Sequence, residues 1–288
     1  MSSLTQLRHY GRLIRIERPI GSYLLLWPTL WALWIASEGL PDWHILAIFV
    51  AGVFIMRSAG CAINDIADRK VDGEVERTKD RPLPSGDITL KEALAVFFVL
   101  LLVAFILVLQ LNQLTILFSL VGALLAASYP FMKRFHHLPQ VYLGAAFAWS
   151  IPMAFTAVTG ELPPPVAWLL FTANLIWTTG YDTMYGMCDR EDDVKIGVKS
   201  TAILLGNNDR LIVGVTQVFT LLTLLGAGFM AGLSGWFWLG LLAASGFFIY
   251  QQYLIRDRDR WLSLRAFLNN NWAGMMIFLG IAADYTLR

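Results

Sequence analysis

Apolar segments of nearly the length that a helix needs to cross a membrane, about 20 residues, recur from one end of this chain to the other. The nine segments are 20–36, 45–63, 93–109, 114–131, 141–158, 166–185, 211–231, 236–254 and 267–285. Such segments are stable only against lipid or against one another, and in lipid a single chain satisfies its backbone hydrogen bonds as helices. The sequence therefore predicts an all-α polytopic membrane protein with nine transmembrane helices.

The composition agrees with this fold class. The chain has 288 residues, of which 57% are hydrophobic and 15% charged, and its mean hydropathy is +0.57. A soluble domain carries about 25% charged residues. The net charge of +1 gives no sign of a nucleic-acid partner, and the two cysteines, Cys61 and Cys188, give no disulfide framework.

The basic residues predict an orientation. The connections after the first, third, fifth and seventh apolar segments, 37–43, 110–113, 159–165 and 232–235, contain neither Lys nor Arg. Because Lys and Arg concentrate on the cytoplasmic side of a membrane, we expect a cytoplasmic N-terminus and a C-terminus on the opposite side.

A cluster of acids follows the second apolar segment, where residues 64–72 read NDIADRKVD. On a helix, Asn64, Asp68 and Asp72 are spaced i, i+4 and i+8 and share one face. Carboxylates this close raise one another's pKa, so a cation is expected among them, and oxygen ligands suit Mg²⁺. The alternative is a solvated loop of mixed charge at the end of a helix.

A second acidic cluster, YDTMYGMCDREDD at 181–193, follows the sixth apolar segment. Asp182 and Asp189 lie two helical turns apart on one face, and Asp189 and Asp193 repeat the i, i+4 spacing. Both clusters follow even-numbered segments, so both are expected on the cytoplasmic side. Facing each other there, they would hold two metal ions with a diphosphate between them.

Two further local patterns make predictions. Thr89 is expected to cap the helix that begins after it, with Glu92 as its capping-box partner. The three asparagines at 269–271 lie in the last apolar segment, where polar side chains are expected to face the protein interior.

The two acidic motifs resemble those of the UbiA superfamily of intramembrane prenyltransferases. The resemblance continues through RPLPSG at 81–86, YPFMKR at 129–134, LPQ at 138–140 and KST at 199–201, over nearly the whole chain. WSIPMAF at 149–155 is similar to the branch that prenylates 4-hydroxybenzoate in ubiquinone biosynthesis. The resemblance implies one domain, 1–288, in a bacterial inner membrane with a periplasmic C-terminus. It also implies a helix bundle around a central cavity open to the cytoplasm, with acidic loops at 64–87 and 182–208.

The resemblance implies transfer of a polyprenyl group from polyprenyl diphosphate to the ring carbon ortho to the hydroxyl of 4-hydroxybenzoate. The expected Mg²⁺ ligands are four carboxylates, those of Asp68, Asp72, Asp189 and Asp193. Asn64 adds a neutral oxygen, and Lys133 and Arg69 are expected to take charge that develops on the leaving diphosphate. The remaining expected substrate-site residues are Tyr129, Asp65, Asp182 and Asp192.

The carboxylate of the acceptor needs a cation, and two arginines are candidates. Arg57 lies inside the second apolar segment, and Arg15 lies where the chain enters the first one. The alternatives are an ion pair with an aspartate of a motif and a side chain that snorkels to the membrane surface.

Other function classes share some of these sequence features. Intramembrane acids are also found in transporters, although here they lie at helix ends rather than in the middle of a span. A non-catalytic membrane scaffold leaves two metal-type clusters without a role. Within the enzyme class, the alternative acceptors are another quinone precursor or haem.

Overall fold

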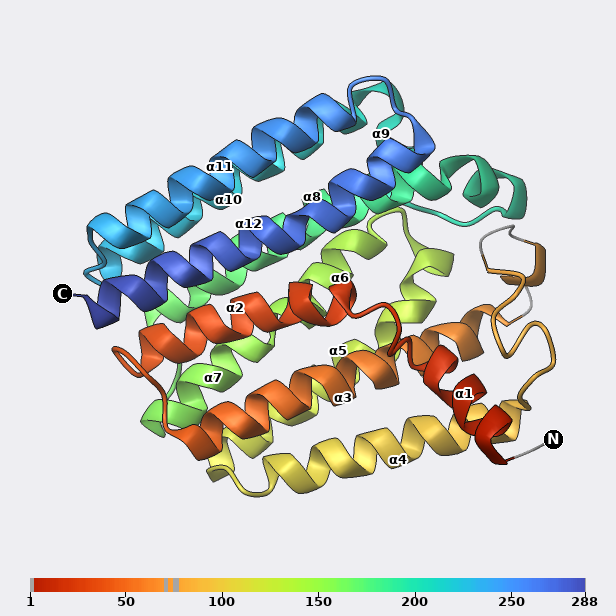
Figure 1. Ribbon diagram of the computed structural model, residues 1–288, viewed down its shortest axis with the longest axis horizontal. Coiled ribbons are helices and arrows are strands. Elements are labelled where there is room, and N and C mark those ends of the chain that lie inside the picture. The colour runs from red at the N-terminus through yellow and green to blue at the C-terminus, as the bar shows by residue number, and fades with distance from the viewer. Residues whose placement is uncertain (1–2, 70–71, 75–77, 288) are drawn as a thin grey trace.

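The computed structural model describes residues 3–69, 72–74 and 78–287, and within them it contains helices and no strands (Figure 1). The all-α prediction is therefore confirmed for the described chain. The α-helices are α1 (Ser3–Leu13), α2 (Ile20–Ala36), α3 (Trp43–Asp68), α4 (Leu90–Val108), α5 (Gln113–Phe135), α6 (Pro139–Ala148), α7 (Ser150–Thr159), α8 (Pro165–Ile196), α9 (Thr201–Leu205), α10 (Asp209–Met230), α11 (Gly235–Leu254) and α12 (Arg260–Thr286). Two short 3₁₀ helices are η1 (Asp72–Glu74) and η2 (Gly206–Asn208).

Each predicted apolar segment coincides with one helix except the fifth. Residues 141–158 form two consecutive helices, α6 and α7, which meet at Trp149. Pro152 lies in the first turn of α7, where a missing N–H is tolerated but a continuous helix through it would lose a hydrogen bond.

The first acidic motif departs from the prediction of one continuous helical face. Helix α3 ends at Asp68, with Arg69 as its C-cap, and Asp72 begins the separate helix η1. Asn64 and Asp68 therefore share an α-helix, whereas Asp72 belongs to the loop that follows. The second motif is helical throughout, because α8 continues to Ile196.

Five helical stretches of the described chain are long and apolar enough to cross a membrane. They are Trp43–Asp68, Leu90–Val108, Gln113–Met132, Pro139–Thr159 and Thr201–Met230, and Ile20–Ala36 is a shorter apolar helix. The chain is a multi-pass membrane protein, and its nine crossings remain a prediction. Apolar side chains of α4, among them Phe98 and Leu102, are exposed, as expected of a surface in contact with lipid.

The main core is built on tryptophans that pack between α2, α8 and α12. The Trp31 and Trp177 rings stack at 5.4 Å between centroids, and Gly274 allows this approach, because a Cβ there would lie 2.7 Å from the Trp177 ring. Trp177 Nε1 donates to Asn270 Oδ1 at 2.9 Å. Asn270 and Asn271 are buried, so the prediction that this asparagine run faces the interior is confirmed.

One end of the bundle gathers the polar loops. Figure 1 shows α1, the ends of α3 and α8, α9 and the α11–α12 connection at this end, with the C-terminus at the opposite end. Thr89 and Glu92 form the predicted capping box at the start of α4. Glu92 also accepts a hydrogen bond from the Tyr10 hydroxyl at 3.0 Å, which attaches α1 to α4.

Candidate active site

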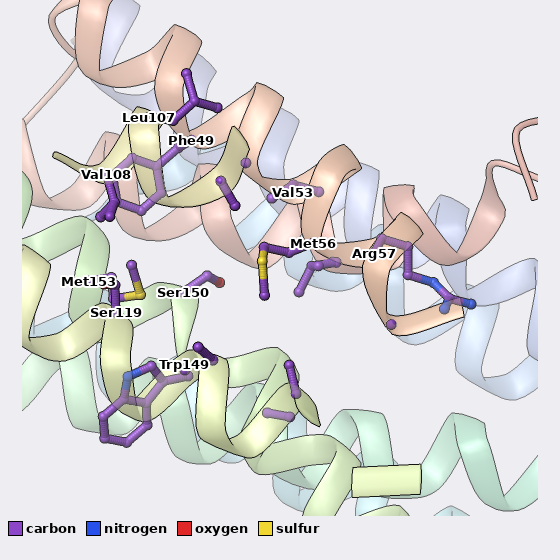
Figure 2. A pocket seen from close by; sticks show the side chains of 18 of the residues that line it. Phe49, Val53, Met56, Arg57, Leu107, Val108, Ser119, Trp149, Ser150 and Met153 are labelled. Carbon is purple, nitrogen blue, oxygen red and sulfur yellow. The ribbon is translucent and has the colours of Figure 1, made fainter. Parts of the chain in front are cut away.

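A cavity of about 380 Å³ lies between α3, α4, α5 and the α6–α7 pair (Figure 2). It follows α3 from Ile48 to Gly60, which corresponds to about 18 Å at 1.5 Å per residue. Its walls are almost entirely apolar. Arg57 and Tyr129 are polar residues that line it at the end nearer the first acidic motif.

Arg57 lies at the opposite end of the cavity from Phe49 (Figure 2). Its Nη1 donates to Cys61 Sγ at 2.9 Å, and its buried Nε has no hydrogen-bond partner among the described residues. Gly21 of α2 leaves space for the guanidinium, because a Cβ there would lie 2.5 Å from Arg57 Nε. A buried N–H group without a hydrogen-bond partner is costly, and an anionic ligand would satisfy the Nε of this half-buried side chain.

Tyr129 places this cavity between the two acidic motifs. Its side chain is close enough to Asp68, Asp182 and Arg57 for their charges to act on its hydroxyl. Helices α3, α5 and α8 therefore bring residues from both motifs to the same end of the cavity. Lys133, one turn beyond Tyr129, belongs to α5, but its side chain lies outside the described part of the structure.

The first motif presents buried carboxylates. Asp68 is 4% exposed and Asp72 is 6% exposed. Arg81 Nη1 donates to Asp72 Oδ2 at 2.8 Å, and the Thr78 hydroxyl donates to the Asp72 carbonyl. Burial raises the pKa of Asp72; Arg81 opposes this shift, while nearby Asp68 and Asp65 add to it. A nearby cation would therefore further stabilise the ionised form of Asp72.

Asp65 has different neighbours from Asp68, because it faces α1 and the loop that follows α3. It is 1% exposed, and its Oδ1 accepts hydrogen bonds from Arg15 Nη2 at 2.8 Å and Arg81 Nη1 at 3.0 Å. Arg15 adopts the left-handed conformation, with φ 56°. The sequence left open whether Arg15 binds the acceptor, pairs with an aspartate of a motif or snorkels to the membrane surface. In the structure it pairs with Asp65. Arg69 is exposed, and its Nη1 donates to the Ile66 carbonyl.

The second motif lies along α8, where Asp189 is buried and Asp182 and Asp193 are half-buried. Asp192 has another environment, because Arg260 Nη2 donates to its Oδ2 at 2.7 Å and Lys195 lies 3.6 Å away. The hydrogen bond from Arg260 lowers the pKa of Asp192. Asp192 therefore attaches the end of α8 to the start of α12.

Sequence reasoning missed a buried ion-pair cluster beside the second motif. Asp209, at the start of α10, is 0% exposed. It pairs with Arg190, the residue after Asp189, and Arg258 Nε donates to its other oxygen at 2.9 Å. These arginines are 19 and 49 positions away from Asp209 in the sequence, so no local spacing pattern could have identified them. The cluster fixes α8 against α10 and the α11–α12 connection.

A family model described as the UbiA prenyltransferase family matches residues 25–275. The chain belongs to this family. One relative, 4-hydroxybenzoate octaprenyltransferase of Photobacterium profundum, is 57% identical over 288 residues and covers 100% of both chains. The protein of the same name from Saccharophagus degradans is 60% identical over 275 residues, which is 96% of this chain and 92% of the relative.

Solved structures agree with the UbiA fold. A UbiA homolog from Aeropyrum pernix superposes with a TM-score of 0.81 at 24% identity, covering 91% of this chain and 97% of the homolog. A UbiA homolog from Archaeoglobus fulgidus bound to GPP and Mg²⁺ superposes with a TM-score of 0.71 at 16% identity, covering 96% and 99% of the two chains.

The buried carboxylates of this UbiA-family chain suit a divalent metal that takes its other ligands from water or from phosphate oxygens. Within residues 3–69, 72–74 and 78–287, no three His, Cys, Asp or Glu side chains are grouped closely enough to hold a metal ion by themselves. Mg²⁺ is usually bound by one or two carboxylates, waters and substrate phosphates. Buried Asp68, Asp72 and Asp189 supply hard oxygen donors of this kind.

Proposed function

We propose that this UbiA-family chain transfers a polyprenyl group from polyprenyl diphosphate to 4-hydroxybenzoate, giving 3-polyprenyl-4-hydroxybenzoate in ubiquinone biosynthesis. The observation that carries the proposal is Arg57, a cation with a buried unpartnered Nε where an apolar cavity meets the acidic motifs. The names of relatives that are 57% and 60% identical over almost the whole chain support the same reaction.

The donor fits the two halves of the site. The isoprenoid chain occupies the apolar cavity, and its diphosphate lies at the acidic end. Together with the diphosphate, four carboxylates and the neutral oxygen of Asn64 would hold Mg²⁺ there: those of Asp68, Asp72, Asp189 and Asp193. When bound, Mg²⁺ neutralises charge on the diphosphate and makes it a better leaving group. Lys133 and Arg69 supply further positive charge at this end.

The acceptor lies between Arg57 and the reactive carbon of the donor. Arg57 binds the carboxylate, and this contact orients the ring. The carbon–oxygen bond of the donor breaks, and the electron pair leaves with the diphosphate. The ring carbon ortho to the hydroxyl then bonds to the allylic carbon, and loss of its proton restores aromaticity. The apolar walls keep water away from the cationic carbon.

Replacement of Arg57 by Ala is expected to raise the KM for 4-hydroxybenzoate by about 10- to 100-fold, the effect of losing a charge-assisted hydrogen bond. The KM for polyprenyl diphosphate should change little, because only one substrate loses its binding contact. Steady-state kinetics with each substrate varied in turn measures both constants. Arg57→Lys keeps the charge without the planar fork and should show a smaller effect. If Arg57→Ala weakened only the diphosphate substrate, Arg57 would belong to the donor site and Arg15 would become the candidate for the acceptor.

Removal of divalent cations is expected to abolish transfer, since the buried carboxylates cannot hold a diphosphate without a metal between them. Activity of the purified protein is measured after treatment with EDTA and after addition of excess Mg²⁺ or Mn²⁺. Activity should return with either metal. Full turnover after exhaustive chelation would exclude the metal site.

We further propose that residues 1–288 form one domain in a bacterial inner membrane, with a cytoplasmic N-terminus and a periplasmic C-terminus. The absence of Lys and Arg from alternate connections supports this orientation.

Native Cys61 and Cys188 are buried, so introduced thiols can be labelled selectively. Glu161→Cys should react with a membrane-impermeant reagent in intact cells, whereas Ser85→Cys should not. The reverse pattern would contradict the orientation.

A further inference from the structure

A second cavity, of about 900 Å³, lies between α10 and α11 and shares no lining residue with the cavity at the acidic motifs. Exposed apolar side chains form much of its lining, including Leu211, Val218 and Ile249. Helix α10 packs mainly on α8, and α11 packs mainly on α12. Because α10 and α11 have different main partners, a groove remains open between them, and we call it the α10–α11 groove.

A network of amides closes the floor of the α10–α11 groove. Gln217 Nε2 donates to Gln251 Oε1 at 2.8 Å, and Gln252 Nε2 donates to Gln217 Oε1 at 3.0 Å. Gln251 Nε2 donates in turn to Asn269 of α12 at 3.0 Å. Polar groups among apolar side chains are stable only when hydrogen-bonded. The network therefore fixes a polar floor, of which Gln217 and Gln252 line the groove.

The end of the groove nearest the acidic motifs is positively charged. Arg210 and Arg258 line it, and its described lining includes no Asp or Glu. Asp209, the carboxylate that pairs with Arg258, is shared with Arg190. Asp209 therefore does not balance both lining arginines, since it also pairs with Arg190, which does not line the groove. The neighbouring Arg256 is balanced by its ion pair with Asp257.

We propose that the α10–α11 groove binds one anionic phospholipid, with its phosphate against Arg210 and Arg258 and one acyl chain along α10. Guanidinium groups are well matched to phosphate oxygens, and basic pockets between membrane helices bind anionic head groups. The apolar lining beyond the arginines accommodates a hydrocarbon chain. A zwitterionic lipid carries a positive group beside its phosphate. The arginines at this end of the groove would repel that group, so an anionic lipid is favoured.

The spacing of the lining residues along α10 fits such a lipid. From Arg210 to Leu221 the helix rises about 16 Å, and from Arg210 to Gly214 about 6 Å. Gln252 lies beside Gly214, since a Cβ there would be 3.6 Å from Gln252 Nε2. The second N–H of this amide can donate to an ester carbonyl of the lipid at that depth. The phosphate, ester and acyl regions thus meet a cationic, a polar and an apolar part of the groove in turn.

Native mass spectrometry of the full chain in detergent tests this proposal with phosphatidylglycerol and phosphatidylcholine of identical acyl chains. We expect one retained phosphatidylglycerol, bound more tightly than phosphatidylcholine. Arg210→Gln should weaken phosphatidylglycerol binding about fivefold, the typical contribution of one cation near an anionic head group. The matched variant Arg256→Gln removes a nearby cation that does not line the groove and should leave binding unchanged.

A second pair of variants tests the acyl part of the groove. Val218 lines the groove and is 55% exposed, whereas Leu222, one turn along α10, is 56% exposed and does not line it. Val218→Trp should prevent retention of the lipid, and Leu222→Trp should preserve it. Neither residue belongs to the proposed prenyl-transfer site, and the readout is lipid binding rather than transfer.

Three results would overturn the proposal. The first is equal affinity for the two lipids, and the second is the same loss of binding for Arg210→Gln and Arg256→Gln. The third is displacement of the phospholipid by geranyl diphosphate at equal concentration, which would make the groove a second site for prenyl diphosphates.

Discussion

The variants Asp68→Asn and Asp189→Asn are each expected to lower prenyl transfer by about 10²- to 10³-fold, the usual cost of removing a preorganised electrostatic group. Each amide nearly preserves the shape of the side chain but removes the negative charge that holds Mg²⁺. Both carboxylates are buried, Asp68 at the end of α3 and Asp189 two turns before the end of α8. The measurement is the initial rate of transfer with labelled polyprenyl diphosphate. The amount of inserted protein is quantified first.

The matched control for this prediction is Asp257→Asn. Asp257 has a side chain that is 70% exposed and pairs only with Arg256 among the described ion pairs, so its replacement should leave the rate unchanged. A partial recovery of Asp68→Asn at high Mg²⁺ concentration would place the defect in metal binding. Near-normal rates for both Asp68→Asn and Asp189→Asn would contradict the proposed mechanism.

Replacement of Asp209 by Asn is expected to lower the free energy of unfolding by about 3 kcal/mol, in the range for breaking a buried ion pair by removing one partner. The variant leaves Arg190 and Arg258 facing each other without the carboxylate that they share. The loss of stability should appear as a lower midpoint of thermal unfolding in detergent.

The same explanation predicts the behaviour of two further variants. Adding Arg190→Gln to Asp209→Asn should recover part of the lost stability, because one of the two uncompensated cations is removed. Asp257→Asn should be nearly neutral, since exposed ion pairs contribute about 0–1 kcal/mol. An Asp209→Asn variant as stable as the wild type would show that the cluster does not hold α8 and α10 together.

Hydropathy predicted the helices well because an apolar segment of this length has few alternatives to a helix in lipid. It did not predict how far the helices extend beyond the apolar segments. Helix α8 continues through the whole acidic motif to Ile196, whereas α3 ends at Asp68. The break between α6 and α7 was also missed, because residues 141–158 form one nearly continuous apolar segment in the sequence.

The acidic motifs could be recognised because their spacing is local in the sequence. The partners of these acids could not, because they lie outside the motifs, either in the loop that follows or in distant elements. Arg81 bridges Asp65 and Asp72, and Arg15 reaches Asp65 from a position 50 residues away. Only the folded chain distinguishes Arg15, which is engaged in this ion pair, from Arg57, whose Nε has no partner among the described residues.

The most direct measurement of the central proposal is an assay of the purified protein with radiolabelled polyprenyl diphosphate, Mg²⁺ and a small set of aromatic acceptors. With 4-hydroxybenzoate, we predict a product prenylated at the carbon ortho to the hydroxyl. Phenol, which lacks the carboxylate bound by Arg57, and benzoate, which lacks the activating hydroxyl, should give little product. Transfer to phenol as fast as to 4-hydroxybenzoate, or no transfer to 4-hydroxybenzoate, would contradict the proposal.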